Sequence, residues 1–234
     1  MFYRKLCTLC GALAITSIAL TGVAGASSSG SPATVTVRIE GLTKTLLATT
    51  KVTTHIGSIT KDGTPAGACP ATSAAGALDV ATHHDWSGDY DSTYGLELVS
   101  ILGEAHPFTS KDYWEIFVGN VAADAGLCDL SLHRGEQVLF AAVPDSGPDE
   151  YPIAVQLPAS AKVGKTLTAK VVYYNAKGKA TPLANATVTA GKHSYTSNSR
   201  GQVKLKAPSA GKLILRATEK NYIRSAPATV QVKK

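Results

Sequence analysis

The sequence predicts a mostly β protein that consists of a small α+β domain followed by an all-β sandwich. One stretch, Ser73–His83, has the apolar spacing of a helix. The stretches around it alternate apolar and polar residues, which is the period of a half-buried strand. The composition is rich in Gly, Thr, Ser and Val and contains 17% charged residues. Such a composition favours β structure and excludes a disordered chain.

The α+β domain is expected to contain one helix packed against four or five strands. Val35, Val37 and Ile39 alternate with polar residues and therefore share one face of the first strand. Thr72 or Ser73 can cap the helix. Strands are predicted over 35–40, 45–54, 96–102, 113–118 and 137–143, and the stretch 85–95 (DWSGDYDSTYG) is predicted to be turn-rich.

The second half of the chain has a more regular pattern of short strands. Leu167, Ala169 and Val171 alternate with polar residues, and turn signals such as Asn175–Gly178 and Asn198–Gly201 separate the strands. Seven short strands with such turns are typical of a β-sandwich. The predicted strands cover 153–157, 166–174, 185–190, 194–197, 202–206, 212–218 and 228–233.

The two halves have opposite charge. Residues 27–145 contain six Lys or Arg and fourteen Asp or Glu, which gives a formal charge of −8. Residues 146–234 contain fifteen Lys or Arg and three Asp or Glu, which gives +12. The Pro- and Gly-containing stretch between the halves is typical of a linker. We therefore predict domains over 27–145 and 152–234, joined by a linker over 146–151.

Residues 1–26 have the features of a secretory signal peptide. Arg4 and Lys5 precede an uncharged apolar run that ends in Ala24-Gly25-Ala26, which are small residues suited to signal-peptidase cleavage. About 20 apolar residues could also span a membrane as an uncleaved anchor. The Gly and Ala content of the run favours cleavage. We expect a secreted or cell-surface protein that contacts the membrane only if this segment is uncleaved.

The mature chain is predicted to contain one disulfide. Cys7 and Cys10 lie within the signal segment, so Cys69 and Cys128 remain. An exported chain with one pair of cysteines most simply joins them. The alternatives are free thiols or metal ligation, but neither cysteine has a nearby Cys or His at zinc spacing. A bridge that closes a loop of about 60 residues would contribute ~4 kcal/mol in the chain-entropy model.

The first domain resembles a known family in the run 113–140. This run contains, in order, Tyr113-Trp114, Gly119-Asn120, Gly126 and Gly135-Glu136. It is similar to the transcobalamin C-terminal-like domains of bacterial secreted proteins (the DUF4430 group), although the order Gly119-Asn120 departs from their usual Asn-Gly. The resemblance implies a β-grasp fold, with the helix lying across a mixed sheet. In transcobalamins such a domain covers one face of a cobamide that is held against a helical barrel. This chain contains no barrel.

The second domain resembles bacterial immunoglobulin-like repeats and carboxypeptidase-regulatory-like domains. The resemblance covers 182–232, with repeated turn-and-strand patterns at Gly201–Leu205 and Gly211–Ala217. It implies an immunoglobulin-like sandwich. Such domains usually serve as spacers or adhesive modules, which is an analogy between folds.

The sequence contains no convincing catalytic or metal-binding pattern. His83-His84-Asp85, with Asp89 and Asp91 nearby, could hold a divalent metal, but adjacent histidines point in different directions. A polar end of the helix explains these residues more simply. The G-x-S-x-G and phosphate-binding glycine motifs are absent. We therefore expect no catalytic residues, no bound metal, no cofactor and no enzymatic activity.

The best candidate ligand-binding residues are Trp86, Tyr90 and Tyr94. Amphipathic rings on an exposed loop suit a carbohydrate or a corrin-like surface. The alternative is that these rings only cover the sheet. Trp114 alternates with Ile116 and is expected to lie in the core.

The expected function is non-enzymatic recognition or adhesion at the bacterial cell envelope. The basic second domain could bind an anionic envelope polymer, whereas export argues against a nucleic-acid partner. A second possibility is capture of a small ligand on the first domain, where only the family resemblance indicates a cobamide. A third possibility is that the two oppositely charged halves dock on each other.

Overall fold

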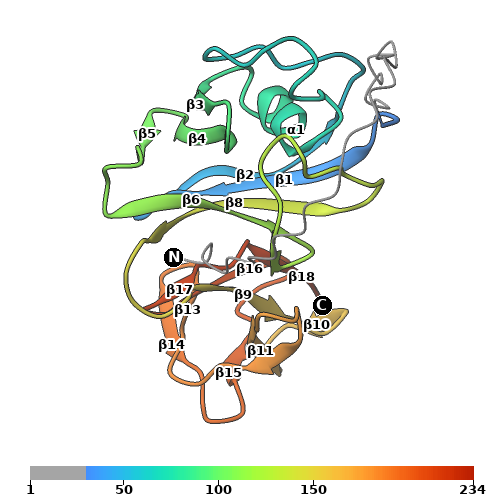
Figure 1. Ribbon diagram of the computed structural model, residues 1–234. Coiled ribbons are helices and arrows are strands. Elements are labelled where there is room, and N and C mark those ends of the chain that lie inside the picture. The colour runs from blue at the N-terminus through green and yellow to red at the C-terminus, as the bar shows by residue number, and fades with distance from the viewer. Residues whose placement is uncertain (1–29) are drawn as a thin grey trace, which may run out of the picture.

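The computed structural model describes residues 30–234. The predicted signal segment, with Arg4 and Lys5, lies outside the described residues. The described part of the protein is mostly β, with 50% of its residues in strands and 4% in helix, which confirms the predicted fold class (Figure 1). Among residues 30–234, no helix is long and apolar enough to span a membrane.

A five-stranded mixed sheet organises the first domain. Its spatial order is β2-β1-β8-β6-β7. β1 and β8 are parallel, and the pairs β1–β2 and β6–β8 are antiparallel. A central parallel pair flanked by antiparallel neighbours is the β-grasp arrangement that the family resemblance implies. The strands are β1 (Thr34–Glu40), β2 (Thr45–Thr53), β6 (Asp112–Val118), β7 (Val121–Ala122) and β8 (Gln137–Pro144).

The helix α1 (Ala74–Ala81) packs on one face of this sheet (Figure 1). Ser73 is its N-cap residue, as predicted, although its Oγ donates to the Pro70 carbonyl at 2.6 Å and makes no capping hydrogen bond. The predicted helix extends to His83. It ends earlier because His83 and His84 have positive φ angles of 54° and 69°, which a right-handed helix cannot contain.

The segment predicted to be turn-rich forms a strand, so that prediction was wrong. β3 (Trp86–Asp91) pairs with β4 (Gly95–Ile101), and β4 pairs with β5 (Glu104–Ala105) in a small second sheet. The turn is confined to 92–94. Asp91 Oδ1 accepts hydrogen bonds there from the amides of Thr93 and Tyr94 at 2.7 and 3.0 Å. The turn-forming residues therefore close a hairpin, and pairing with β4 supplies the backbone partners that make 86–91 a strand.

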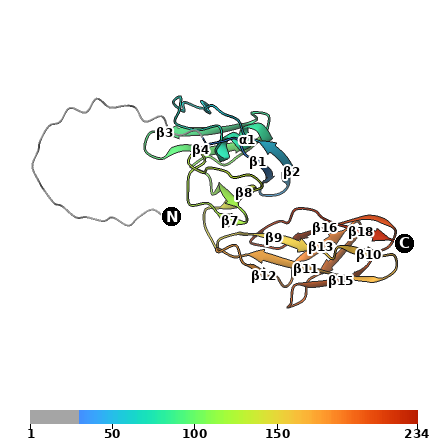
Figure 2. The ribbon, with the colours of Figure 1, turned by 90° about the vertical axis from the view of Figure 1, so that its right-hand side faces the viewer.

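Both faces of the main sheet are covered. Along β8, Val138, Phe140 and Ala142 belong to the core beneath α1. The alternate residues Leu139, Ala141 and Val143 face the other way and cluster with Phe117 of β6. Ile223 of the second domain completes this second cluster. The second domain therefore packs on the face of the sheet opposite to the helix (Figure 2).

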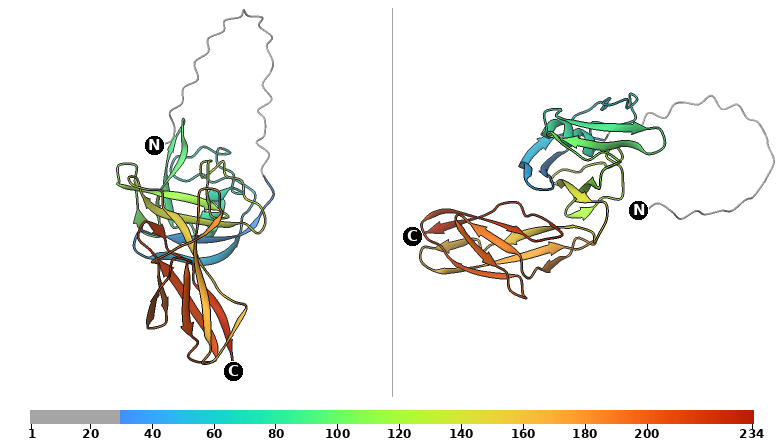
Figure 3. Two further views of the ribbon diagram at one scale, coloured as in Figure 1. Left: turned by 90° about the horizontal axis from the view of Figure 1, so that it is seen from below. Right: turned by 90° about the vertical axis from the view of Figure 1, so that its left-hand side faces the viewer.

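Two packed sheets form the second domain, and the core of this sandwich lies between them. The domain extends away from the first, with the C-terminus at its far end (Figure 3). One sheet has the order β10-β18-β16-β13-β14, and the other has the order β12-β11-β9-β17 with β15 beside β11. The strands are β9 (Tyr151–Gln156), β10 (Ser160–Lys162), β11 (Thr166–Tyr174), β12 (Ala180–Pro182), β13 (Thr187–Ala190), β14 (His193–Thr196), β15 (Gln202–Lys206), β16 (Gly211–Thr218), β17 (Tyr222–Ile223) and β18 (Ala228–Lys233).

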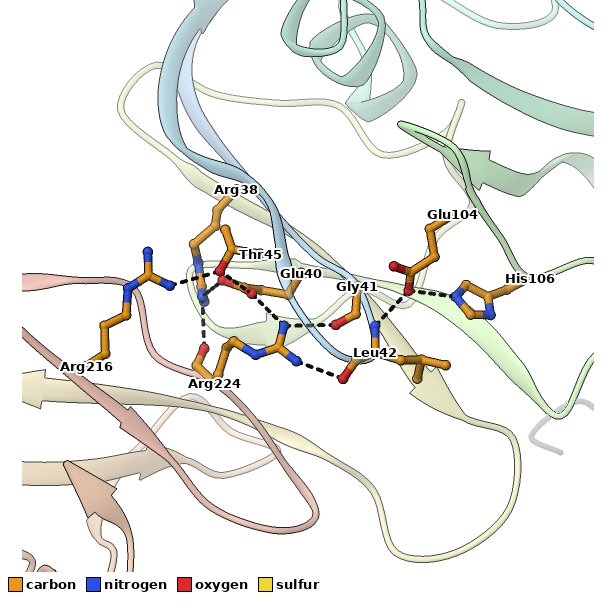
Figure 4. A network of polar contacts seen from close by, with 9 residues as sticks. All are labelled: Arg38, Glu40, Gly41, Leu42, Thr45, Glu104, His106, Arg216 and Arg224. Atoms are coloured by element: carbon orange, nitrogen blue, oxygen red, sulfur yellow. Dashed lines mark hydrogen bonds and ion pairs between the residues drawn. The ribbon is translucent and has the colours of Figure 1, made fainter. Parts of the chain in front are cut away.

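A buried polar network joins the two domains (Figure 4). Glu40, at the end of β1, is 1% exposed and accepts from Arg38 at 2.7 Å and from Arg224 at 2.9 Å. Arg224 also donates to the carbonyls of Gly41 and Leu42. The halves therefore dock, but few charges take part in the contact. Among residues 30–234, no lysine forms an ion pair, so the basic charge of the second domain stays largely at its surface.

β8 ends at Pro144 and β9 begins at Tyr151, the last residue of the predicted linker. The chain therefore passes from the main sheet of the first domain to the sandwich within the acidic, Pro-containing stretch. The predicted boundaries concern which segments fold independently, and they remain a prediction. They place domains over 27–145 and 152–234 and a linker over 146–151.

Candidate binding groove

The three aromatic residues predicted from the sequence do not form one site. Trp86 is 4% exposed, and its Nε1 donates to Asp79 Oδ1 at 2.8 Å. Tyr90 is half-buried and packs against the core of the first domain. Tyr94, at the tip of the β3–β4 hairpin, is 80% exposed. Tyr94 lines a groove, whereas Trp86 and Tyr90 do not line it.

This groove, which we call the aromatic groove, has a volume of about 300 Å³ and lies between β4, β6 and the segment 123–127. Tyr94 and Phe108 line the groove, and Phe108 is 89% exposed. Trp114 and Leu127 also line it but are buried, so the prediction that Trp114 belongs to the core is confirmed. Exposed rings over an apolar floor are typical of binding sites on soluble proteins.

Within the described part of the chain, the edge of β6 along the groove has no strand partner for most of its length. β8 pairs with the other edge of β6, whereas β7 pairs only with Phe117 and Val118. Ala123 then donates to the carbonyl of Ile116 at 2.8 Å. Before Ile116, this edge of β6 has no pairing strand within residues 30–234, and the amide of Asp112 donates to Ser110 Oγ at 3.2 Å.

The disulfide positions one wall of the groove. Cys69 and Cys128 are joined as predicted, with a Cα–Cα distance of 4.6 Å. The amides of Ala74 and Ala75, at the start of α1, donate to the carbonyls of Leu130 and Leu127 at 2.9 and 3.1 Å. One covalent bond and two hydrogen bonds thus hold the wall formed by Leu127 and its neighbours against the helix.

Carboxylates supply the polar character of the groove. Glu97 and Glu115 line it, and Tyr113 Oη donates to Glu115 Oε2 at 2.8 Å. Burial raises the pKa of Glu115, and the charge of Asp149 raises it further, although the Tyr113 hydrogen bond opposes the shift. Burial likewise raises the pKa of Tyr113, assisted by Glu115. The groove therefore combines apolar rings with hydrogen-bond acceptors of negative charge.

A buried histidine supports the floor of the groove. His106 is 6% exposed, and its ring packs edge-on against Trp114 with a centroid distance of 5.2 Å. Its Nε2 lies 3.1 Å from Glu104 Oε1, which also accepts from the Leu42 amide at 2.7 Å (Figure 4). These contacts fix the orientation of Trp114 beneath the exposed rings.

The histidines at the end of the helix form no metal site. His84 Nδ1 lies 2.7 Å from Asp79 Oδ2, the same carboxylate that accepts from Trp86. Within the described residues 30–234, no group of three or more His, Cys, Asp or Glu side chains could hold a metal ion.

Phe108 was missed by the sequence reasoning because one apolar residue in the loop His106-Pro107-Phe108-Thr109 belongs to no periodic pattern. An aromatic residue between turn-forming and polar neighbours was the available signal. Tyr113 was missed because only the family resemblance drew attention to it.

No protein-family model matches the chain, and no curated protein matches it. Haptocorrin in complex with Cbi is similar over 49% of this chain and 25% of its own length, with 15% identity and a TM-score of 0.37. A candidate metal-binding protein from Ruminococcus gnavus is similar over 49% of this chain and 99% of its own, with 12% identity and a TM-score of 0.33. Red sea bream transglutaminase is similar over 42% of this chain and 17% of its own length, with 22% identity and a TM-score of 0.23. The chain thus spans a quarter of the length of haptocorrin and less than a fifth of that of the transglutaminase.

Proposed function

We propose that the protein is a non-enzymatic binding protein of the bacterial cell exterior that recognises a carbohydrate in the aromatic groove. The observation that carries this proposal is the pair of exposed rings, Tyr94 and Phe108, beside the acceptor groups of Glu97 and Glu115. A sugar presents apolar C–H groups on the faces of its ring and hydroxyl donors around its edge. The C–H groups pack on aromatic rings, and the hydroxyl groups donate hydrogen bonds to carboxylates.

Charge narrows the class of carbohydrate. The first half of the chain has a formal charge of −8, and two carboxylates line the groove. A neutral or amino-substituted sugar suits this environment, whereas a phosphorylated or carboxylated one would be repelled. The volume of about 300 Å³ lies at the lower end of the range for small-molecule sites, roughly 300–1,000 Å³. The groove therefore suits a short stretch of a glycan.

The alternative is a secreted small-ligand binder, with a cobamide as the ligand that the family resemblance implies. A flat macrocycle could lie across Tyr94 and Phe108, and the groove would then contact only one of its faces. Binding of a corrinoid in preference to neutral oligosaccharides would favour this alternative.

The second domain is proposed to hold the protein at the envelope by binding an anionic polymer. Lys170 of β11 and Lys204 and Lys206 of β15 are exposed, and these two strands are paired. They point away from the sandwich core, because the alternate residues Ala169, Val203 and Leu205 belong to it. Attraction of this kind weakens as salt screens the charges. The apolar segment over 1–26 and the disulfide support a secreted or cell-surface location.

The test is calorimetric titration of residues 27–234 with neutral envelope oligosaccharides and, separately, with a corrinoid. Tyr94→Ala and Phe108→Ala should each weaken oligosaccharide binding about tenfold, since each removes one stacking ring. Ile56→Ala is the matched control, because Ile56 is 72% exposed and does not line the groove. The oligosaccharide should be recovered chemically unchanged. Equal binding by all four proteins would contradict the proposal.

A further inference from the structure

A second cavity lies between the two domains, apart from the aromatic groove. Its volume is about 190 Å³. The second domain contributes Tyr174 to the polar lining of the cavity, and the first contributes Thr36, Arg38, Thr49, Asn120 and Gln137. The lining contains one cation, two amides and several hydroxyl groups, but no carboxylate. A cavity with this lining is suited to a group of negative charge.

Arg38 has hydrogen-bonding capacity that the protein does not use. It is 9% exposed, and both of its hydrogen bonds leave from Nη1, to Glu40 Oε1 at 2.7 Å and to the Arg224 carbonyl at 2.9 Å. In residues 30–234 its Nη2 and Nε have no hydrogen-bond partner in the protein. Within residues 30–234, Thr64 Oγ1 is the one fully buried side-chain nitrogen or oxygen atom that lacks a hydrogen-bond partner. Arg38 Nη2 and Nε lack partners too, so both must be partly accessible. One side of the guanidinium therefore remains free beside the cavity.

Arg38 lies in a cluster of three arginines that surrounds Glu40. Glu40 is shared between Arg38 and Arg224, and the side chain of Arg216 lies close enough to donate to Thr45 Oγ1 at 3.0 Å (Figure 4). Burial lowers the pKa of Arg38, and the charges of Arg216 and Arg224 lower it further, whereas Glu40 acts in the opposite direction. Glu150, near Arg224, and Glu104, which accepts from the Leu42 amide, supply further negative charge. The free side of Arg38, and not a net excess of positive charge, is therefore what favours an anion in the cavity.

We propose that this cavity binds a small oxyanion, with the free side of Arg38 as the charged donor and Gln137, Asn120 and Tyr174 as neutral donors. The side chains of these three residues have no hydrogen bond to the rest of residues 30–234. The planar fork of a guanidinium matches two oxygens of a phosphate, sulfate or carboxylate group. This site is distinct from the aromatic groove, whose carboxylates would repel the same ligand.

An oxyanion in this cavity would contact both domains at once. Arg38, Gln137 and Asn120 come from β1, β8 and the β6–β7 turn, whereas Tyr174 ends β11 of the sandwich. A ligand that binds the docked arrangement and not the separated domains stabilises docking. Binding of the oxyanion would therefore favour one relative placement of the groove and the basic sandwich.

The experiment is calorimetric titration of residues 27–234 with sodium phosphate and with sodium sulfate, at an ionic strength matched by sodium chloride. Arg38→Lys and Gln137→Leu are the test variants, and backbone amide NMR spectra verify that each remains folded. Gln137 is exposed and lies outside the Glu40 network, so Gln137→Leu tests the cavity without disturbing that network. Lys212→Gln is the control for binding of anions to surface lysines, because Lys212 is exposed on β16 and does not line the cavity.

The wild type should bind phosphate or sulfate with heat beyond the chloride control. Arg38→Lys and Gln137→Leu should each weaken binding about tenfold, as expected for loss of a hydrogen bond to a charged group. Lys212→Gln should bind like the wild type. The proposal is overturned if the wild type binds neither anion beyond the chloride control. It is equally overturned if Lys212→Gln loses binding while Gln137→Leu retains it, because the anion would then bind surface lysines.

Discussion

Arg224 of the second domain donates to Glu40 of the first at 2.9 Å, and the two residues lie 184 positions apart in the chain. Glu40 is 1% exposed, so this pair belongs to the interior of the protein. Arg38 balances the other oxygen of the same carboxylate. One buried carboxylate therefore holds an arginine from each domain.

Loss of Arg224 should destabilise the protein. Arg224→Ala would leave Glu40 with one cation and leave the carbonyls of Gly41 and Leu42 without their donor. Removing one partner of a buried ion pair costs about 3 kcal/mol or more. Urea unfolding should show this loss in the free energy of unfolding, and small-angle X-ray scattering should show a larger radius of gyration. Arg200→Ala, at an exposed turn, is the control and should change neither quantity.

Loss of the disulfide should weaken both stability and ligand binding. Cys69→Ser with Cys128→Ser removes a link across 59 positions of the chain, which corresponds to ~4 kcal/mol in the chain-entropy model. The wall of the groove at Leu127 would then be held to α1 by hydrogen bonds alone. Thermal unfolding and oligosaccharide titration measure the two effects. An unchanged affinity in the folded double variant would show that the bridge does not position the groove.

Two of the three aromatic residues predicted from the sequence, Trp86 and Tyr94, should have different effects when each is substituted. Trp86→Phe removes the donor to the buried Asp79 carboxylate and should cost about 1–3 kcal/mol of stability, with little effect on ligand binding. Tyr94→Ala should leave the free energy of unfolding within about 0.5 kcal/mol of the wild type and weaken binding, because its ring is exposed. Urea unfolding and calorimetry on both variants test this separation. The reverse pattern would place the ligand near Trp86.

Glu115 should make stability fall as pH rises through the acidic range. Its pKa is raised in the folded protein, chiefly by burial, so the folded state holds this proton more tightly than the unfolded state does. The stabilising effect is complete below the ordinary pKa of Glu. It is lost as pH rises from that value to the raised pKa. Glu115→Gln removes the dependence, so its midpoint of thermal unfolding should rise relative to the wild type between pH 4 and pH 7. The difference should be modest because the side chain is partly exposed.

The regular part of the fold could be predicted because alternation is local. The predicted strands 166–174, 202–206 and 228–233 agree with β11, β15 and β18. The strands that were missed, such as β5, β7 and β17, have two residues each and form only because a neighbouring strand is present. The strand at 86–91 was missed because its Gly and Asp residues resemble those of a turn. Pairing with β4 outweighs that local preference.

The binding groove could be predicted only in part because it is assembled from distant segments. Tyr94 was identified as an exposed ring, but its neighbour in the groove, Phe108, comes from another loop. The sequence also could not reveal that β8 is buried on both faces by two different domains. Its continuous apolar run, Val138–Val143, is consistent with such burial. The contact between Glu40 and Arg224 leaves no local pattern.

The central claim is that the protein recognises its target through the aromatic groove. The direct measurement is sedimentation of residues 27–234 with isolated cell envelopes in about 1 M salt, where the screening length falls to roughly 3 Å and attraction by the lysines is suppressed. The wild type and Ile56→Ala should sediment with the envelopes, and the double variant Tyr94→Ala/Phe108→Ala should remain in solution. Equal sedimentation of all three proteins, or complete release of the wild type by salt, would contradict recognition through the groove.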